Sequence, residues 1–545
     1  MKLNLRFKGV NVAMLSVLVL PAFAQKALVK PNRPNVLFIA VDDLKPILGC
    51  YGDKLAKTPN IDRIAKTGTV FMTNYCQQAV SGPTRASLMT GMRPDYTKIW
   101  DLKTLMRDVN PDIVSLPQYL IKQGYSTQGI GKVYDPRCVD KDLDKPSWSV
   151  PYYKKSDEYN SKVTGLAEMN YQLPATKALI RKYRAEGQGK GLKGTELNDY
   201  IQKRVKPSVE CADVPDNAYN DGANALESKQ ILINLSKSKK PFFFAVGFAK
   251  PHLPFVAPKK YWDMYKRDEM PVAPFQQKSK NGPEIAYHRS SELLMYSDIP
   301  DLASFTDQKV GVNLPLDKQK ELIHGYYAAT SYTDAQVGIL LHTLDSLGLL
   351  KNTIVILWGD HGWHLGDHNL WCKHTNFEQA THAPLLISAP WIKPSKTTSP
   401  SEFIDIFPTI CELTGVPVPE YLDGKSLVPV MNDPKKIIKD FAISQYPRTN
   451  NKEESERLGF SDGEYMGYSL RTERYRYTIW LKNGFRSNKT FNKDLVLASE
   501  LYDYEKDPNE TINVAGEKAY AMVYSDLNNK MVHFMELQAK KLCVR

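Results

Sequence analysis

The sequence has no pair of cysteines at the close spacing found in metal and redox motifs. Its seven cysteines are spread over the 545 residues: Cys50, Cys76, Cys138, Cys211, Cys372, Cys411 and Cys543. This spread argues against a zinc site or a thioredoxin-like motif. One or two disulfides are compatible with an oxidising compartment, but the sequence does not assign their pairing.

No hydrophobic run is long enough to form a stable membrane span. The apolar run from Val10 to Leu20 ends at Pro21 and falls short of the roughly 20 residues that a spanning helix needs. Basic residues precede it and an Ala-x-Ala triplet ending at Ala24 follows it, which is typical of a cleaved secretory signal peptide. We therefore predict an exported, periplasmic protein.

The chain also lacks a nucleic-acid-binding motif and an internal repeat. Its formal net charge is +12, and losing Lys2, Arg6 and Lys8 with the signal peptide removes three positive charges and leaves +9. A basic exported protein suits an anionic extracellular substrate, such as a sulfated or carboxylated polysaccharide. A charge that only keeps the protein soluble explains the number equally well, so the motifs must decide.

The sequence does contain short apolar runs that end in polar residues. Asn35–Val41, Phe242–Phe248 and Thr353–Trp358 are apolar on both faces, which is typical of buried parallel strands. A helical stripe over Leu322–Leu347 stops at Gly348. The alternation predicts an α/β fold with a large doubly wound, mostly parallel sheet flanked by helices.

Composition divides the chain into a large and a small part. We predict a signal peptide over 1–24, a catalytic α/β domain over 25–432 with an insertion at about 137–215, and a C-terminal α+β subdomain over 433–545. The insertion is polar and rich in Tyr, Lys and Arg. The smaller part contains the alternating, strand-like run Tyr475–Trp480.

A hydroxyl nucleophile and a fixed cation stand together in the segment Ser81-Gly82-Pro83-Thr84-Arg85. Pro83 presets φ and removes a donor, which is typical of the first turn of a helix. Ser81 is then expected at the positive end of that helix, with Arg85 one turn further on. By itself the pattern is common and also describes an ordinary helix start.

Carboxylates and an imidazole follow two of the predicted strands. Asp42 and Asp43 come after the first run, and Asp360 and His361 follow the third. In open α/β sheets the carboxyl ends of the strands meet at the edge where ligands bind. This oxygen-rich set suits Ca²⁺ or Mg²⁺ better than a thiolate-seeking metal.

Three further groups follow strand-like segments: Lys132, His252 and Lys373. Hydrolysis of a tetrahedral anionic ester needs cations to hold the anion and a proton donor for the leaving oxygen. These side chains supply both, although a single lysine or histidine is more often structural.

These motifs resemble those of the type I sulfatases, members of the alkaline phosphatase superfamily. Ser81-x-Pro83-Thr84-Arg85 followed by Met89-Thr90-Gly91 is similar to the signature at which that family converts Cys or Ser to formylglycine (3-oxoalanine). The resemblance covers nearly the whole chain and is greatest to the iduronate-2-sulfatase subgroup. Further matching segments are Lys250-Pro251-His252, Asp360-His361-Gly362-Trp363 and Ser444-Gln445-Tyr446-Pro447-Arg448.

The resemblance implies a sulfuric ester hydrolase with one calcium ion, and it implies a role for each matching residue. The Ca²⁺ ligands would be Asp42, Asp43, Asp360, His361 and the formylglycine made from Ser81. Arg85 and Lys132 would hold the formylglycine hydrate, Lys373 and His252 would bind the sulfate and protonate the leaving oxygen, and Trp363 and Arg448 would contact the substrate.

A formylglycine hydrate offers two hydroxyls, one to attack sulfur and a second whose deprotonation expels sulfate. An unmodified serine lacks the second hydroxyl and would stall. Ser81 resembles the serine class matured by an anaerobic radical enzyme, so a serine-type sulfatase-maturating enzyme is an expected partner. The histidine that relatives carry shortly after Lys132 is missing, and Asp135 is a candidate for the base that replaces it.

The expected reaction removes a sulfate ester from an acidic saccharide. The 2-O-sulfate of a uronic acid is the expected linkage, because Arg448 resembles a residue near the sugar carboxylate in that subgroup. Two alternatives stay open. A phosphomonoesterase or phosphodiesterase of the same superfamily would use Ser81 directly, but such relatives bind two zinc ions. A non-catalytic protein that binds sulfated polysaccharides on a decayed scaffold would explain the missing histidine.

Overall fold

The computed structural model describes residues 30–152, 171–288, 290–300, 314–448, 465–482 and 491–544, so the predicted signal peptide lies outside the described residues. A seven-stranded sheet forms the centre of the molecule, with the strand order β12-β2-β11-β8-β1-β6-β4. Its strands are β1 (Asn35–Val41), β2 (Thr69–Phe71), β4 (Ser126–Gly131), β6 (Phe242–Phe248), β8 (Thr353–Gly359), β11 (Leu385–Ser388) and β12 (Ser395–Thr397).

Four neighbouring strands of this sheet, β8, β1, β6 and β4, run parallel. Their register aligns the carboxyl ends, because Val41 of β1 pairs with both Gly359 of β8 and Phe248 of β6. β11 is antiparallel to β8 and to β2. Every residue of β1, β6 and β8 is buried, as the apolar runs predicted. The expected mostly parallel sheet is confirmed.

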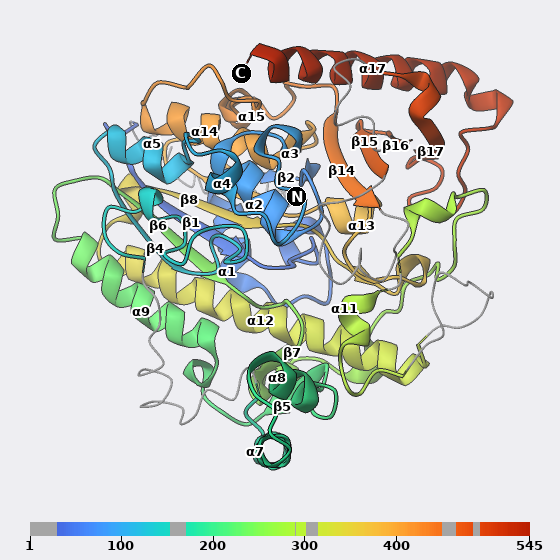
Figure 1. The fold of residues 1–545 in the computed structure, drawn as a ribbon. Helices are drawn as coiled ribbons and strands as arrows, with labels where there is room; N and C mark the ends of the chain where they lie inside the picture. The colour runs from blue at the N-terminus through green and yellow to red at the C-terminus, as the bar shows by residue number, and fades with distance from the viewer. Residues whose placement is uncertain are drawn as a thin grey trace, which may run out of the picture.

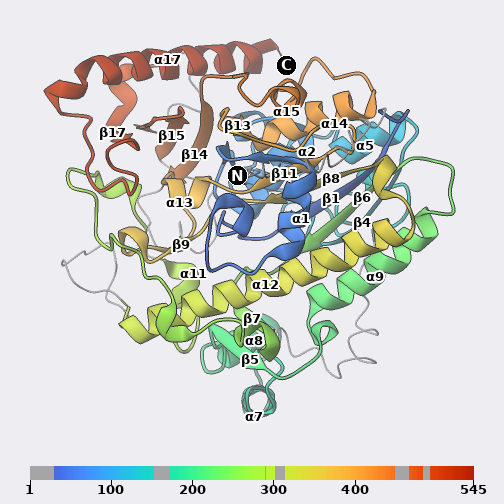
Figure 2. The same ribbon diagram turned by 180° about the vertical axis from the view of Figure 1, so that it is seen from behind.

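Helices cover both faces of the sheet (Figures 1 and 2). The alternation of side chains along β1 sends Val36, Phe38 and Ala40 into one core and Leu37, Ile39 and Val41 into another. The first core is closed by helices α2 (Ser81–Thr90), α5 (Leu116–Lys122) and α14 (Ile406–Thr414). The second is closed by α1 (Pro59–Thr67), α9 (Asn220–Leu235) and α12 (Leu316–Ser346).

The long helix α12 begins six residues before the predicted start at Leu322. Its first turns read Leu316-Asp317-Lys318-Gln319-Lys320-Glu321 and carry no apolar stripe for a pattern to detect. The predicted stop is correct, because the helix ends at Ser346 and Gly348 adopts the left-handed φ of 67°.

A second, antiparallel sheet lies C-terminally and is covered by α17 (Ala521–Val544) (Figure 1). Its strands in order are β14 (Ala442–Arg448), β15 (Tyr465–Arg471), β16 (Tyr475–Lys482) and β17 (Val496–Asp503). The Gln445 N–H donates to the carbonyl of Gln77 at 2.8 Å, and the Ser444 hydroxyl donates to that of Cys76 at 2.6 Å. This sheet therefore packs on the segment that leads into α2.

Part of the predicted insertion forms a lobe at the bottom of Figure 1. It contains α7 (Pro174–Gly189) and α8 (Gly194–Gln202), and β5 (Val209–Ala212) pairs with β7 (Phe255–Pro258) beside it. The shorter helices are α3 (Pro94–Thr97), α4 (Met106–Val109), α10 (Lys259–Trp262), α11 (Ser291–Leu294), α13 (Glu378–Thr381) and α15 (Val428–Asn432). The shorter strands are β3 (Asn74–Tyr75), β9 (His364–Leu365), β10 (Trp371–Cys372) and β13 (Ser401–Glu402).

Two findings concern the exclusions made from the sequence. Six cysteines in the described part of the chain, namely Cys50, Cys76, Cys138, Cys211, Cys372 and Cys411, are free thiols. Within the ranges that the structure describes, no helix is both long and apolar enough to cross a membrane.

Candidate active site

Ser81 is the first residue of α2, the position at which a helix leaves its backbone N–H groups unpaired. Its hydroxyl donates to Asp42 Oδ1 at 3.1 Å and lies 3.4 Å from His361 Nε2, and the residue is only 3% exposed. Glycine suits the next position, because a Cβ at Gly82 would lie 2.4 Å from Cys138 Sγ and would force that side chain to shift. The local sequence thus holds the hydroxyl against the carboxyl end of β1.

The strand register brings the predicted carboxylates together. Asp42 and Asp43 follow β1, Asp360 follows β8, and the Asp43 N–H donates to Asp360 Oδ1 at 2.9 Å. Ligand atoms of Asp43, Asp360 and His361 all lie within 4.8 Å of one another, and so do those of Asp42, Asp43 and His252. Asp43 belongs to both groups, so they form one centre with room for a cation.

The imidazole of His361 fits a role as a metal ligand. Its Nδ1 lies 2.9 Å from the carbonyl of Gly362, which can only accept, so Nδ1 carries the proton. Nε2 then directs its lone pair at the carboxylates, 3.3 Å from Asp43 Oδ1. Together with the three aspartates this gives the hard donor set that an oxygen-seeking divalent cation prefers.

Arg85 ties the centre to two strands at once. Its guanidinium donates to Asp42 at 2.9 Å and to Asp360 at 3.0 Å, and its remaining nitrogen donates to the carbonyls of Lys132 and Val133. The side chain is fully buried. This fork geometry fixes the carboxylates in place, which a lysine could not do.

Two lysines from other segments also converge on the aspartates. Lys132, directly after β4, places its amine 2.5 Å from Asp42, and Lys373, directly after β10, places its amine 3.2 Å from Asp43. Burial alone would raise the pKa of Asp42, but the charges of Lys132 and Arg85 bring it well below its usual range. For Asp43 burial dominates and raises the pKa, although His252 and Lys373 act in the other direction.

His252 lies on the loop between β6 and β7, with Nε2 3.7 Å from Asp43 Oδ2. The buried amine of Lys250 holds this loop by donating to the carbonyls of His252 at 2.6 Å and Pro254 at 2.8 Å. Burial lowers the pKa of Lys250 to about 8. The structure thus brings Ser81 and all the predicted acid–base and ligand residues around one point, which the sequence could only infer.

Sequence reasoning missed Glu292, on the short helix α11. Its carboxylate lies 2.9 Å from Lys373 and 3.1 Å from His252, and its side chain is 12% exposed. Burial would raise the pKa of Glu292, but Lys373 and His252 hold it well below its usual range. No strand precedes Glu292 and no motif contains it, so the sequence carries no signal for its position.

The predicted substrate contacts have other partners in this structure. Trp363 is 1% exposed, and the amine of Lys373 lies 4.9 Å from the centre of its ring. Arg448, at the end of β14, donates to the backbone carbonyls of Ile285 at 3.1 Å and His374 at 2.6 Å. Both side chains therefore support the walls of the site.

Asp135, the candidate for the missing base, is bound to a neighbour. It accepts hydrogen bonds from the Arg137 guanidinium at 2.9 Å and 2.8 Å. Burial opposes ionisation, but these bonds and the charge of Lys132 lower its pKa to about 2. A carboxylate with so low a pKa is a weak base, so these contacts favour a structural role.

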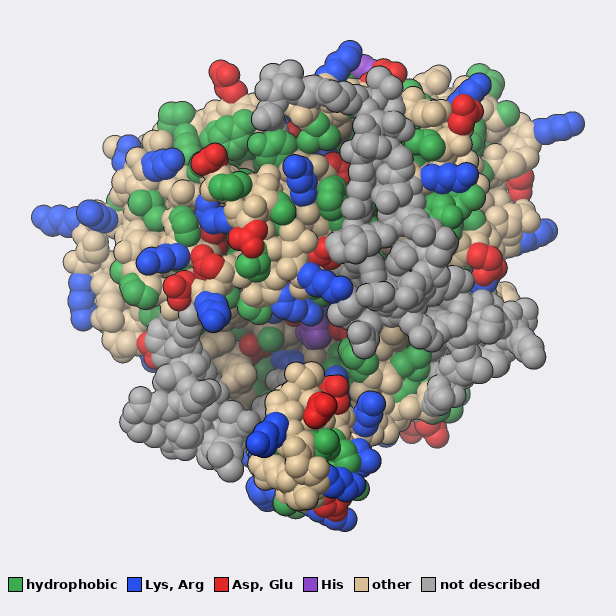
Figure 3. All heavy atoms as spheres, viewed as in Figure 1, with side chains coloured by type: hydrophobic (Ala, Val, Ile, Leu, Met, Phe, Trp, Pro, Cys, Tyr) green, Lys and Arg blue, Asp and Glu red, His purple; other side chains and the backbone are tan. Residues whose placement is uncertain are grey.

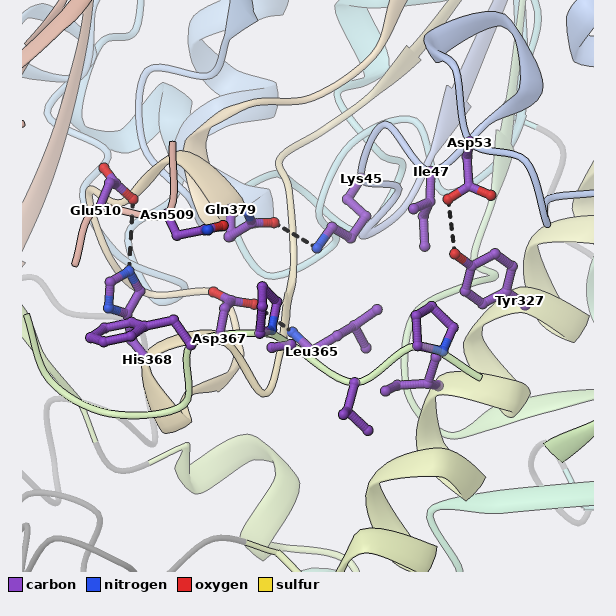
Figure 4. A pocket seen from close by; sticks show the side chains of 16 residues that line it. Lys45, Ile47, Asp53, Tyr327, Leu365, Asp367, His368, Gln379, Asn509 and Glu510 are labelled. Carbon is purple, nitrogen blue, oxygen red and sulfur yellow. Dashed lines mark hydrogen bonds and ion pairs between the residues drawn. The ribbon is translucent and has the colours of Figure 1, made fainter. Parts of the chain in front are cut away.

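Figure 3 shows a hollow beside the α7–α8 lobe in which basic, acidic and histidine side chains are visible. A separate cavity of about 260 Å³ is bordered by Lys45 and Ile47, which follow Asp43 in the sequence. In Figure 4 the amine of Lys45 points to Gln379 on one wall, while Tyr327 donates to Asp53 on another. The residues that border it do not include Ser81.

Comparison with known proteins identifies the arrangement. Residues 34–416 match the Sulfatase family, and residues 366–537 match the C-terminal region of N-sulphoglucosamine sulphohydrolase. This chain belongs to the sulfatase family. It is accordingly a sulfuric ester hydrolase, and the resemblance drawn from its motifs is confirmed.

Relatives of this sulfatase extend over most of its length. It is 32% identical to human iduronate 2-sulfatase, over 88% of this chain and 90% of that protein. It is 29% identical to a sulfatase of Formosa agariphila, over 89% of this chain and 83% of that protein.

Solved structures share the fold. A phosphonate monoester hydrolase of Agrobacterium radiobacter superposes with a TM-score of 0.65 and 24% identity, covering 93% of this chain and 96% of its own. A 2-O GAG sulfatase superposes with a TM-score of 0.60 and 19% identity, covering 93% of each chain. The expected doubly wound architecture is confirmed by these neighbours.

Proposed function

We propose that this sulfatase is an exported, calcium-dependent enzyme that removes the 2-O-sulfate of a uronic acid from an acidic saccharide, with formylglycine made from Ser81 as its nucleophile. The observation that carries the proposal is the position of the Ser81 hydroxyl, 3.1 Å from Asp42 and 3.4 Å from His361.

The charges of the site suit an anionic ester once a divalent cation is bound. Four carboxylates (Asp42, Asp43, Asp360, Glu292) face three fixed cations (Arg85, Lys132, Lys373), which leaves one net negative charge. Asp42, Asp43, Asp360 and His361 would hold Ca²⁺, and its two positive charges would turn the balance to one net positive charge. When bound, the ion supplies positive charge that polarises the attacking oxygen and the ester.

The chain's own residues divide the remaining work. Lys132 contacts Asp42 and Lys373 contacts Asp43, and the two amines orient the anion of the substrate. His252, whose side chain is 27% exposed and whose Nε2 faces the carboxylates of Asp43 and Glu292, donates a proton to the leaving sugar oxygen. Arg85 holds the carboxylates so that they do not swing toward the substrate.

The saccharide and its linkage rest on the relatives. A protein 32% identical over most of both chains is named iduronate 2-sulfatase, and the basic charge of the chain suits a carboxylated, sulfated saccharide. Signal-peptide cleavage near Ala24, a periplasmic location and a serine-type sulfatase-maturating enzyme belong to the same proposal. The domain limits 25–432 and 433–545 are proposed as well.

Mass spectrometry of the peptide that contains Ser81 tests the mechanism. In enzyme from a host with the serine-type maturing enzyme, we expect the peptide to have lost two hydrogens and the protein to release sulfate from a 2-O-sulfated uronate disaccharide. Ser81→Ala should fold normally and release none. Active enzyme with an unmodified Ser81 would point to direct attack by serine, and matured protein that binds without turnover would point to a saccharide-binding role.

A further inference from the structure

A second cavity, of about 610 Å³, lies at the edge of the main sheet opposite to Ser81. It is bordered by the last turn of α1, the turn Leu350–Asn352, the start of β8 and the segment 390–394. β8 leads from this cavity toward the catalytic edge over seven residues. At about 3.3 Å for each residue, the cavity and the active site are about 20 Å apart. Figure 2 shows α1 and α12, which contact each other on this side of the sheet.

Cations alone supply the charge of this cavity, which we call the basic cavity. Its lining includes Arg63, Lys66, Lys351 and Lys393 and no carboxylate. Arg63 pairs with Asp345 at 2.9 Å, whereas the three lysines are exposed and make no ion pair with any residue of the described ranges. Lysines that line one cavity without carboxylates in the same lining attract anions. The cavity near Lys45 differs, because three carboxylates line it.

The rest of the lining is apolar with a few hydroxyls. Ile64, Leu341 and Val355 contribute aliphatic side chains to the lining, and the half-buried Trp391 belongs to it together with its neighbour Pro390. A volume of this size falls in the range of small-ligand sites. An indole offers a flat apolar face with a polar edge, which suits the apolar face of a sugar ring. Cations beside an indole and aliphatic side chains match a ligand that is anionic at its rim and apolar on its ring faces.

We propose that the basic cavity is a second binding site for an anionic saccharide chain, separate from the site that cleaves the ester. The charges of Lys66, Lys351 and Lys393 bind sulfate or carboxylate groups, and Trp391 packs on a sugar ring. The identity of the saccharide rests on the proposed function. Since the two sites are about 20 Å apart, the second one retains long chains near the enzyme and leaves disaccharides unaffected.

Calorimetric titration of a sulfated glycosaminoglycan hexasaccharide tests the proposal. Ser81→Ala protein is used so that the ligand is not consumed. We compare it with the same protein carrying Lys66→Gln, Lys351→Gln and Lys393→Gln, and with a matched control in which the exposed Lys237, Lys239 and Lys240 become Gln. Thermal unfolding of each variant confirms that it is folded.

We expect the parent protein to bind two hexasaccharides for each chain. The Lys66/Lys351/Lys393 variant should bind one of the two about tenfold more weakly, as the loss of three exposed ion pairs predicts. The control variant should match the parent. Trp391→Ala should weaken hexasaccharide binding at the same site. Titration with a desulfated but carboxylated hexasaccharide shows whether the lysines bind sulfate or carboxylate groups. Inorganic sulfate is titrated in the same way. If the three lysine substitutions abolish sulfate binding while Trp391→Ala has no effect on hexasaccharide binding, the cavity is a simple anion site and the saccharide assignment is overturned.

The result also separates this proposal from the proposed function. A single site that the three lysine substitutions leave unchanged overturns the basic cavity and leaves the proposed function standing. A single site that these substitutions remove supports the basic cavity and contradicts saccharide binding at Ser81. If none of the three proteins binds the hexasaccharide, both the basic cavity proposal and the proposed function are contradicted.

Discussion

At the scale of single residues, the active site is an assembly of opposite charges that stabilise one another. Asp42, Asp360 and Arg85 are all at most 1% exposed, and a buried charge of this kind is stable only when it is paired. The arrangement explains why the carboxylates stay close together before a cation binds. It also means that a charged side chain that is paired with a neighbour is less free to bind a substrate.

Glu292 is the residue for which this coupling gives a test. In the proposed mechanism Lys373 and His252 bind the sulfate group, and the carboxylate of Glu292 would compete with sulfate for both side chains. Glu292→Gln should therefore make inhibition by free inorganic sulfate about tenfold stronger, as the removal of one nearby like charge predicts. Inhibition constants measured with matured enzyme check the prediction. Glu284→Gln, at an exposed carboxylate, should leave the constant unchanged. Weaker inhibition in the Glu292 variant would contradict a competing role.

The sequence predicted the residues of this site that stand in motifs or at strand ends. Asp42, Asp43, Asp360 and His361 could be identified because buried parallel strands have recognisable ends and one shared edge. Glu292 could not, because it reaches the site from a short helix whose position depends on tertiary packing. The same reason hid the partners of Arg448, whose carbonyl contacts come from distant segments.

At the scale of elements, the position of Lys132 depends on close approach of two strands. A Cβ at Gly247 of β6 would lie 2.1 Å from the carbonyl carbon of Lys132, just after β4. Strand ends that meet this closely leave no space for a side chain. The amine of Lys132 is therefore placed by the packing of its backbone as much as by Asp42.

Gly247→Ala should accordingly displace Lys132. We expect a loss of about 1–3 kcal/mol in the free energy of unfolding from overpacking, together with a lower kcat/KM. Urea unfolding and steady-state kinetics measure the two effects. Gly189→Ala is the control, because nothing lies within 4 Å of a Cβ at that helical position, and it should be neutral or slightly stabilising. If Gly247→Ala changes neither the free energy of unfolding nor kcat/KM, β4 and β6 can move apart at little cost and the prediction is contradicted.

The C-terminal sheet contains a buried carboxyl that makes its stability depend on pH. Glu500 accepts hydrogen bonds from Trp480 at 2.8 Å and Tyr502 at 2.9 Å, yet burial raises its pKa to about 7. The folded protein then binds this proton more tightly than the unfolded chain, whose glutamates titrate near pH 4.3. Stability from this group is present below that value and is lost as the pH rises to about 7.

Glu500→Gln should remove that dependence. Between about pH 4.5 and about pH 7 the parent should lose about 3 kcal/mol more of its free energy of unfolding than the variant does. Urea unfolding at a series of pH values measures the difference, with Glu517→Gln as an exposed control. Parallel curves for the parent and the Glu500 variant would contradict the raised pKa.

The elements themselves were predictable to different degrees. The limits of β1 and β6 agree with the apolar runs, because strands that are buried on both faces contrast sharply with their polar flanks. The first turns of α12 and the short strands β9 and β10 escaped detection, since they carry no apolar period of their own. Their formation depends on contacts with distant segments.

At the scale of the whole molecule, the active site joins parts of the chain that are far apart in sequence. Asp43 and Lys373 are separated by 330 residues, and Arg85 joins the ends of β1 and β8. A cation that binds at this junction favours the folded state over every state in which the strands have separated. Ligand binding and global stability are therefore linked.

Addition of Ca²⁺ should raise the melting temperature, and a chelator should reverse the change. At a concentration about 100-fold above Kd the stabilisation should be about 2.7 kcal/mol. Differential scanning calorimetry measures the shift. Asp43→Asn should abolish the response, whereas Asp526→Asn, on the exposed face of α17, should retain it. If the melting temperature of the parent protein does not change when Ca²⁺ is added, the calcium dependence in the proposed function is contradicted.

The depth of Ser81 also sets an order of events. With 3% of its surface accessible, and with α2 and the β14 sheet packed around the segment that carries it, the hydroxyl is out of reach of any modifying enzyme in the finished protein. The conversion of Ser81 that we propose would therefore have to take place on a newly made, still extended polypeptide. Under the proposed mechanism, a molecule that folded with an unmodified Ser81 would have to unfold before it could be converted.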